Sequence, residues 1–286
     1  MISFPLLGKH YKLGNQLFQY AFLRSTALRL GVKFYCPEWI GDSIFLLNDK
    51  NEREQEPINI SKVYFQDRIK PGFSKNALNI EDGTEIQGLF QSEKYFEESQ
   101  VRNWYTFREE SISKVMDKYK HIDFSQSVGM HFRFGENTLS RQYIIPHVHY
   151  YKKALEIVKH KGVILVFSDE IDLAREYLEK IKVKPIYVEG GRDYEDLYLM
   201  TLCHDFISSV STFSWWGAWL IKYEDKSVVC PKEWVRPGHP AAKSLDLTPE
   251  RWVQLRAARF LIDNYYVMRP LLCVRGKVIH FTDGIE

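Results

Sequence analysis

The chain has 286 residues, of which 45% are hydrophobic and 27% are charged, and its formal net charge is +2. This composition is that of a globular protein with a full core, and the length allows one large or two ordinary domains. Because the net charge is so small and no run of Lys and Arg marks a basic groove, a nucleic-acid partner is not expected.

The first residues predict a strand and no targeting segment. Residues 1–16 lack a basic start followed by a long apolar region and a small-residue cleavage site. The longest uncharged run, 206–221, is short for a membrane span and rich in Ser, Thr and Gly. The cysteines are scattered without a C-x-x-C pair, as is typical of reduced thiols in the cytosol: Cys36, Cys203, Cys230 and Cys273. We therefore expect a soluble, cytoplasmic protein without an integral membrane segment.

The first part of the chain predicts an alternation of strands and helices. Residues 3–6 form a short strand, and a helical pattern runs from Asn15 to Gly31, which is the expected C-cap. Further strands are predicted over 32–36 and 84–90, whereas the polar segment 48–62 predicts an exposed excursion. A strand, a glycine-containing turn and a helix allow a backbone to approach a phosphate closely. Because only one glycine is placed at the helix start, the sequence is a weak match to the fingerprint of dinucleotide-binding proteins.

A second alternation begins near residue 125. Its strands are expected over 128–132, 163–167, 185–188, 206–210 and 227–230, and its helices over 150–159, 172–181, 194–202 and from Thr212 onward. Strands that are unbroken apolar runs indicate a parallel sheet covered on both faces. Two such alternations predict an α/β protein with two Rossmann-like domains facing across a cleft, which binds ligands at the carboxyl ends of the strands. We expect domains at 1–125 and 126–254, and a C-terminal extension at 255–286.

The stretch from Asp205 to Ile221 organises the second half. A short buried strand turns on Ser211 and Thr212 into a helix that carries three tryptophans. Ser and Thr are favoured helix N-caps. A hydroxyl-lined helix N-terminus offers backbone N–H groups and a positive dipole end to an anion, typically a phosphate. An ordinary capped core helix is the alternative.

Two polar side chains end the strand over 128–132. His131 and Arg133 are two residues apart, so they project to the same side. Arginine is always charged and can hold a pyrophosphate with two N–H groups. His131 could bind a nucleobase or a sugar. The competing interpretations are a core histidine with its hydrogen bonds satisfied and an arginine in a surface ion pair.

Two aspartates follow later strands. Asp169 could supply polar contacts or cap the next helix, and Asp196 lies in the first turn of a helix, where acids are tolerated. No two aspartates are separated by one residue, so the D-x-D clamp that holds a metal and a diphosphate in many nucleotide-sugar enzymes is missing. His147 and His149 have no further ligands nearby. No metal site is therefore expected.

Together, these blocks resemble glycosyltransferase family 11, which contains the α-1,2-fucosyltransferases. They occur in the family's order over roughly residues 8–235: LGNQLFQYA (13–21), GLFQSEKYF (88–96), His131-x-Arg133, FSD (167–169) and STFSWWGAWL (211–220). The resemblance implies the two-domain GT-B fold, GDP-fucose as donor and a glycan as acceptor. It also implies inversion at the sugar carbon and no metal or other cofactor.

The same resemblance implies roles for individual residues. Arg133 would hold the diphosphate, and His131 would lie near the guanine or the ribose. Asn15 would approach the phosphates from the other domain. The remaining candidates for donor binding are Asp169, Asp196 and the four residues that would present hydroxyls and amides to the phosphates: Ser211, Thr212, Phe213 and Ser214.

The chain departs from the family directly after Arg133. The family usually continues Arg-Gly-Asp, whereas this sequence has Phe134, Gly135 and Glu136. The second Arg is lost and the acid is one methylene longer, which affects the expected donor sugar and acceptor more than the reaction class. Glu136 is the candidate base for the acceptor hydroxyl. A structural carboxylate is the alternative, and strong stabilisation of the leaving group could make a base unnecessary.

The resemblance thus implies a metal-independent, inverting fucosyltransferase. Negative charge grows on the departing diphosphate, and Arg133 and the helix that begins at Thr212 would stabilise it in the transition state. Two alternatives stay open. One is an enzyme with another nucleotide-sugar as donor, and the other is a catalytically inactive relative that binds a nucleotide or a glycan.

Overall fold

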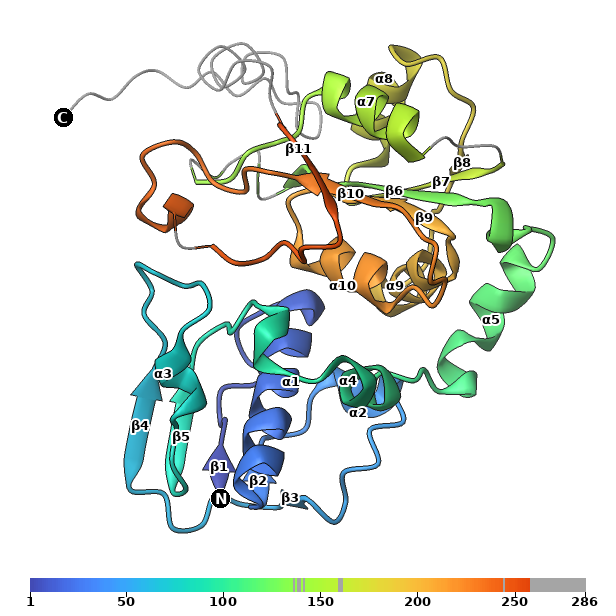
Figure 1. Cartoon of the computed structure of the whole chain (residues 1–286). Helices are drawn as coiled ribbons and strands as arrows, with labels where there is room; N and C mark the ends of the chain where they lie inside the picture. Colours follow the sequence, from blue (N-terminus) through green and yellow to red (C-terminus); the bar gives the residue numbers. More distant parts are fainter. Residues whose placement is uncertain (136, 138–139, 141, 159–161, 244, 258–286) are drawn as a thin grey trace.

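The computed structural model describes residues 1–257 except 136, 138–139, 141, 159–161 and 244. Two β-sheets are present, one in each half of the chain, and every pair of neighbouring strands within them is parallel. Helices lie on the faces of both sheets (Figure 1). The predicted α/β fold with two parallel-sheet units is confirmed.

The first sheet has the strand order β3-β2-β1-β5-β4. Its strands are β1 (Ile2–Ser3), β2 (Phe34–Tyr35), β3 (Arg53–Glu54), β4 (Lys62–Phe65) and β5 (Thr84–Gln87). Helix α1 (Leu13–Leu30) ends at Gly31, where a φ of 66° lets the Gly31 N–H reach the carbonyls of Ala27 and Leu28, as predicted. The shorter helices of this half are α2 (Ile40–Ile44), α3 (Lys75–Leu78), η1 (Glu93–Tyr95) and α4 (Glu98–Trp104).

The second sheet has the order β11-β10-β9-β6-β7-β8. Its strands are β6 (Val128–Phe132), β7 (Ile164–Ser168), β8 (Ile186–Tyr187), β9 (Asp205–Ile207), β10 (Val228–Pro231) and β11 (Val253–Leu255). The connecting helices are α7 (Val148–Val158), α8 (Ile171–Glu179), α9 (Asp193–Leu202), α10 (Thr212–Leu220) and the short η3 (Pro240–Lys243). Helix α5 (Glu109–Tyr119) and η2 (Phe124–Gln126) lead into this half from the first (Figure 1).

The two faces of the second sheet belong to different cores. Met130 and Val166 point toward α7 and α8 and form a smaller cluster there. Leu165 and Phe167, on the other face, join a larger cluster that continues through α9, α10 and α1 to the first sheet. Alternation along β6 puts His131 on the face toward this larger cluster. The two halves therefore share one hydrophobic core.

Helix α10 lies at the centre of the shared core. Its three tryptophans are at most 1% exposed. Phe18 of α1 lies 4.5 Å from the Trp215 ring and 4.7 Å from the Trp216 ring, measured between centroids. Arg102 of α4 lies 4.7 Å from the Trp219 ring and donates to the carbonyls of residues 219, 220 and 221. Because those carbonyls have no partner within the helix, Arg102 completes the C-terminus of α10 from the other half.

Ion pairs add to this contact between the halves. Lys94 Nζ lies 2.9 Å from Asp246 Oδ1, and Arg251 Nη1 lies 2.8 Å from Glu93 Oε2. Glu93 also accepts a 2.9 Å hydrogen bond from Trp219 Nε1. Residues of both segments line a small hollow of about 260 Å³. The GLFQSEKYF block thus joins the halves as well as contributing to the first sheet's core.

Several predicted element positions are wrong. Segment 48–62 is not only an exposed excursion, because it contains β3 and the first residue of β4. Helix α1 begins at Leu13 with Lys12 as its N-cap, so Asn15 lies inside the first turn. β9 covers three residues and ends at Ile207, before the predicted end at 210, and β11 was not predicted. The short β3 and β11 lack a run of apolar residues, so periodicity does not reveal them. The predicted C-terminal extension at 255–286 lies almost wholly outside the described residues.

Within the described part of the chain, no helix is both long and apolar enough to cross a bilayer.

Candidate functional site

The polar residues singled out in the sequence gather where two helix N-termini meet the carboxyl ends of β6 and β7. β6 pairs with β7 and β9, so the chain leaves all three parallel strands at the same edge of the sheet. Four residues separate the end of β9 from the start of α10. The N-terminus of α1 contacts the N-terminus of α10 from the first half.

Asp169 binds the segment that follows β6. Phe132 pairs with Ser168, so Arg133 and Asp169 leave neighbouring strands side by side. Arg133 Nη1 lies 2.8 Å from Asp169 Oδ2, and the Phe134 N–H donates to Asp169 Oδ1 at 2.9 Å. A Cβ on Gly135 would lie 2.4 Å from the same carboxylate, so the close approach requires glycine. One carboxylate thus fixes both the Arg133 guanidinium and the turn after it.

Two interpretations left open by the sequence are resolved for this pair. Asp169 does not cap α8, since the N-cap is Glu170 without a side-chain cap bond. The Ser168 hydroxyl instead accepts the Glu170 N–H. Arg133 does form an ion pair, but it is only partly buried, with 20% of its side chain exposed. The ion pair is therefore not sealed within the core.

His131 is buried and has an unsatisfied nitrogen. The residue is 4% exposed, and its Nδ1 has no hydrogen-bond partner among the described residues. Its ring centroid lies 6.1 Å from that of Phe213 on α10. Burial, with Arg133 nearby, lowers the pKa of His131 to about 3. The imidazole is therefore neutral, and the satisfied core histidine considered above is not what the structure shows.

The N-terminus of α10 is not capped by its own hydroxyls. Ser211 is the N-cap residue, yet its side chain makes no capping bond. Thr212 Oγ1 donates to Asn15 Oδ1 at 3.1 Å. Ser214 is fully buried, and its Oγ lies 3.1 Å from Ser208 Oγ, so this hydroxyl points into the second half. The first-turn N–H groups, which have no partner within a helix, are thus not used by the Ser211 hydroxyl.

Asn15 and Gly14 of the first half contact the N-terminus of α10. Asn15 Oδ1 also accepts from Gln91 Nε2 at 2.7 Å, and Trp216 Nε1 donates to the Gly14 carbonyl at 3.0 Å. A Cβ on Gly14 would lie 2.5 Å from the Phe213 nitrogen, so only glycine allows the helix ends to touch. The roles of Gly14 and Gln91 were not predicted. Their positions inside the LGNQLFQYA and GLFQSEKYF blocks are the signal that could have indicated them.

Two predicted residues do not join this cluster in the described contacts. Asp196 lies in the first turn of α9, with Oδ1 buried and unpartnered among the described residues. Burial and the neighbouring acids Asp193 and Glu195 raise the pKa of Asp196 to about 7, which Lys118 partly opposes. Its charged neighbours therefore come from α9 and α5, not from the Arg133 segment. Glu136 lies outside the described residues.

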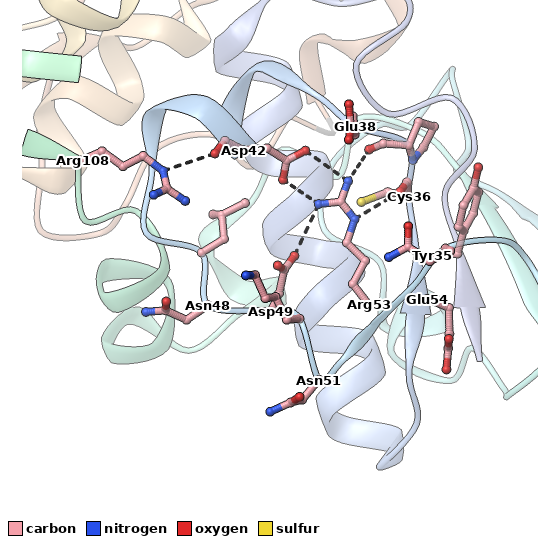
Figure 2. Close-up of a pocket in the computed structure, with 14 residues that line it drawn as sticks. Tyr35, Cys36, Glu38, Asp42, Asn48, Asp49, Asn51, Arg53, Glu54 and Arg108 are labelled. Atoms are coloured by element: carbon pink, nitrogen blue, oxygen red, sulfur yellow. Dashed lines mark hydrogen bonds and ion pairs between the residues drawn. The ribbon is translucent and has the colours of Figure 1, made fainter. Parts of the chain in front are cut away.

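A larger hollow lies elsewhere, at the edge of the first sheet. It has a volume of about 840 Å³ and is lined by residues of β2, β3, α2 and their loops (Figure 2). Arg53 donates to Asp42 at 2.5 Å, to the Cys36 carbonyl at 3.2 Å and to the Pro37 carbonyl at 2.6 Å, and its Nη1 lies 3.6 Å from Asp49. None of the predicted site residues lines this hollow. Its central arginine ties together the loops around it.

Metal-binding side chains do not cluster in the part of the chain that the structure describes. No group of three or more His, Cys, Asp or Glu side chains lies there in an arrangement that could hold an ion.

Comparisons with known proteins identify relatives in sequence and in structure. The family model described as "Glycosyl transferase family 11" matches residues 9–255. An α-1,2-colitosyltransferase from Escherichia coli is 25% identical in an alignment that covers 85% of this chain and 96% of that protein. The E. coli O-antigen biosynthesis glycosyltransferase WbnK is 39% identical in an alignment that covers 37% of this chain and 35% of WbnK.

Among solved structures, POFUT1 in complex with GDP-fucose is similar with a TM-score of 0.53 at 12% sequence identity, over 79% of this chain and 97% of that one. At this identity the similarity concerns the fold, which is of the GT-B type.

Proposed function

The chain belongs to glycosyltransferase family 11, and from this premise we propose that it moves fucose from GDP-fucose to a hydroxyl of a glycan. We further propose that the new linkage is α-1,2, that the sugar carbon is inverted, and that no metal takes part. The observation that carries the proposal is the meeting of Arg133, His131 and the N-termini of α1 and α10 at one edge of the second sheet.

The chemistry of the leaving group fits this arrangement. As the bond from the sugar to the diphosphate breaks, negative charge accumulates on the diphosphate oxygens. The N-terminus of α10 would offer the positive end of its dipole and N–H groups that its own hydroxyls do not cap. Arg133 would add a full positive charge, already oriented by Asp169. Groups fixed in this way before the reaction stabilise the transition state without reorganising.

The other candidate residues would act around this centre. The neutral His131 can exchange a hydrogen bond with a ribose or a base, and donor binding would provide a partner for its buried nitrogen. Asn15 would hold the first half against the phosphate site through Thr212. Asp169 would contribute by fixing Arg133. Glu136 stays the proposed base, and Asp196 a proposed contact with the donor.

Two observations favour a second donor. A relative that aligns over most of this chain is a colitosyltransferase. The chain also has Phe134 and Glu136 where the family usually has Arg and Asp. A colitosyl nucleotide is therefore the alternative donor. A binding protein without turnover is the remaining alternative.

The proposal is tested by measuring GDP release from the purified full chain. We expect slow release from GDP-fucose alone and faster release with a glycan that ends in galactose. Parallel reactions contain GDP-colitose, UDP-galactose or UDP-glucose, each with and without EDTA. Turnover of another donor in place of GDP-fucose would reassign the donor, and activity lost to EDTA but restored by manganese would exclude the metal-independent mechanism. Donor binding without any release would identify an inactive relative.

We also propose a cytoplasmic location. Cys36, Cys203 and Cys230 are all buried and free, and burial raises the pKa of each thiol to about 12, so the reactive thiolate is strongly disfavoured. Such thiols suit a reducing compartment. Fractionation of cells that express the full chain would test this.

A further inference from the structure

The most exposed large apolar residues of the described chain lie within one short segment. Phe65, Ile69 and Val63 are 64%, 63% and 53% exposed, more than any other large hydrophobic side chain in that part. All three belong to the segment that includes β4 and the turn after it, at the outer edge of the first sheet. Scattered apolar residues are normal on a surface, but a cluster of this kind marks an interaction site.

The fold itself does not account for this exposure. Along β4, Tyr64 faces the core and lies 6.4 Å from the Phe90 ring, so Val63 and Phe65 point to the opposite face. Val63 pairs with Glu85 and Phe65 with Gln87 on β5. Parallel sheets are normally covered on both faces. Here β4 is an edge strand whose outward side chains are left in solvent.

The turn that carries Ile69 is held in place by hydrogen bonds. Gln66 Nε2 donates to the Pro71 carbonyl at 2.9 Å, and Gln66 Oε1 accepts from the N–H groups of Leu89 and Phe90 at 2.8 and 2.9 Å. Asp67 Oδ1 accepts from the N–H of Ile69 at 2.7 Å. The apolar side chains are therefore presented by an ordered turn.

Positive charge surrounds the tip of this turn. Arg68 and Lys70 flank Ile69, and no ion pair among the described residues involves either of them. Asp67 is the acid within the turn: its carboxylate accepts hydrogen bonds from backbone N–H groups and also interacts with the charge of Lys70, so it offsets one of the two positive charges. Farther along β4, Lys62 pairs with Glu81, and Glu85 lies beside Val63. The excess of positive charge is thus confined to the tip.

We propose that this β4 patch, which consists of Val63, Phe65, Arg68, Ile69 and Lys70, docks on an anionic lipid bilayer. Aliphatic and aromatic side chains enter the boundary between headgroups and acyl chains, and flanking basic side chains are attracted by anionic lipids. This combination matches the chemistry of the patch better than pairing of β4 with another strand, which would leave Arg68 and Lys70 unused.

The patch lies near the contact between the two halves. Phe73 comes just after the turn, and its ring centroid lies 5.9 Å from Lys94 Nζ. Lys94 in turn pairs with Asp246 of the second half. Tyr95 holds the same loop by accepting the Ser74 N–H at 2.8 Å. Docking would therefore bring the junction of the two halves toward the bilayer surface. This inference stands independently of the donor and of the reaction proposed above.

Vesicle flotation with the full chain tests the proposal. The probes are vesicles of phosphatidylethanolamine with about a quarter phosphatidylglycerol, and vesicles of phosphatidylcholine alone. We expect binding to the anionic vesicles, weakened by high salt because the attraction is partly electrostatic. The double variant Arg68→Gln/Lys70→Gln should bind about thirtyfold more weakly. The double variant Phe65→Ser/Ile69→Ser should bind at least about tenfold more weakly.

Matched control variants remove the same kinds of side chain at exposed positions outside the β4 patch. Ile40→Ser/Met116→Ser removes two exposed apolar side chains, and Lys152→Gln/Lys153→Gln removes two exposed charges from α7. Both should bind as the unchanged protein does. All variants should keep their melting temperature and their GDP release with a water-soluble acceptor, because none of the changed side chains is buried or placed in the site.

Three results would overturn the proposal. The first is that the unchanged chain does not bind anionic vesicles. The second is binding that the patch variants leave intact, which would assign the contact to another surface. The third is a lipid-independent dimer in sedimentation that Phe65→Ser/Ile69→Ser dissociates, which would assign the patch to a second copy of the chain.

Discussion

The two halves of the molecule each contain an arginine held by an aspartate, but the surroundings of the two pairs differ. Arg53 lies in the larger hollow and binds Asp42 and two backbone carbonyls, with Asp49 nearby (Figure 2). Arg133 pairs with Asp169 at the strand ends, beside an uncapped helix N-terminus and the unsatisfied His131 nitrogen. The first environment is complete as it stands, whereas the second contains polar groups that a ligand would satisfy.

This difference favours the region around Arg133 over the larger hollow as the candidate site. The hollow around Arg53 measures about 840 Å³, yet its central charge is already used to fix loops. The region around Arg133 is recognised instead by charge and hydrogen-bonding capacity from four separate segments of the chain. Mutations at the two pairs should therefore have opposite signatures, one in turnover and the other in stability.

The largest effect is expected at Arg133. Arg133→Ala removes the charge that would meet the departing diphosphate, so turnover should fall by about 10²–10³, more than donor affinity falls. Arg133→Lys should rescue poorly, because a point charge cannot replace a bidentate contact. GDP release and the melting temperature are measured on the same preparation. A variant with reduced melting temperature and normal turnover would make Arg133 a structural residue like Arg53.

Arg53→Ala provides the opposite case. It leaves Asp42 and two carbonyls without their partner in a largely buried site, so the free energy of unfolding should drop by about 3 kcal/mol. For a chain of this size the melting temperature should then fall by about 6–12 °C. Turnover of the folded fraction should stay close to normal. If turnover instead fell as far as in Arg133→Ala, the larger hollow would have to be part of the site.

Gly14→Ala tests whether the region around Arg133 depends on the contact between the N-termini of α1 and α10. The added Cβ would lie 2.5 Å from the Phe213 nitrogen and 2.7 Å from the Thr212 carbonyl carbon, so the two ends must separate. We expect a loss of about 1–3 kcal/mol in stability and a drop in turnover. Gly31→Ala is the control: it meets no atom within 4 Å but has a φ of +66°, so it should lower stability alone. Equal turnover in both variants would argue against a role for the contact.

His131 should affect donor binding without titrating. His131→Ala is expected to weaken donor binding by about tenfold while changing turnover less. Because its pKa is about 3, the folded protein keeps His131 neutral between about pH 5 and pH 8, so this imidazole should not contribute a step to the pH profile of donor affinity. Its folded pKa lies below the unfolded value, so its contribution to stability is full above the unfolded pKa and is lost as pH falls. Isothermal titration calorimetry with GDP at several pH values would show whether the affinity changes with the protonation of His131.

The smallest effect on turnover is expected at Asp196, which lies outside both pairs and whose Oδ1 has no partner among the described residues. Its pKa is raised to about 7, so its contribution to stability is present below the unfolded pKa and is lost as pH rises through about 7. Asp196→Asn should therefore raise the free energy of unfolding by about 2–3 kcal/mol more at pH 8 than at pH 5. Thermal melts at both pH values measure this. A drop in donor affinity in the same variant would support its proposed contact with the donor.

Structural features that depend on a local residue pattern could be predicted from the sequence. The unbroken apolar run at 163–167 and the mostly apolar segment 128–132 predicted buried parallel strands, and Gly31 predicted the end of α1. In contrast, β3 has two residues, one of them Arg53, so no apolar run distinguishes it from a loop. Features that depend on strand register were also out of reach. The Arg133–Asp169 pair requires Phe132 to lie opposite Ser168.

The sequence predicted which residues belong to the candidate site better than it predicted the contacts between them. Asn15 and Thr212 were both named, but their hydrogen bond joins residues 197 positions apart, and only the fold brings them together. Ser214 was expected to face the phosphates, yet its hydroxyl contacts Ser208 inside the second half. On a helix, successive side chains point in different directions, so a run of hydroxyls cannot all face one ligand.

The single core that runs from the first sheet through α10 to the second has an evolutionary consequence. Phe18 and Phe96 of the first half pack against Trp215, Trp216 and Trp219 of the second, so neither half has a complete interior alone. A chimaera that joins the first half of this chain to the second half of a relative must match these rings or leave voids between them. The halves should thus diverge together and unfold in one calorimetric transition, which makes recombination at the boundary between them a poor route to new donor specificity.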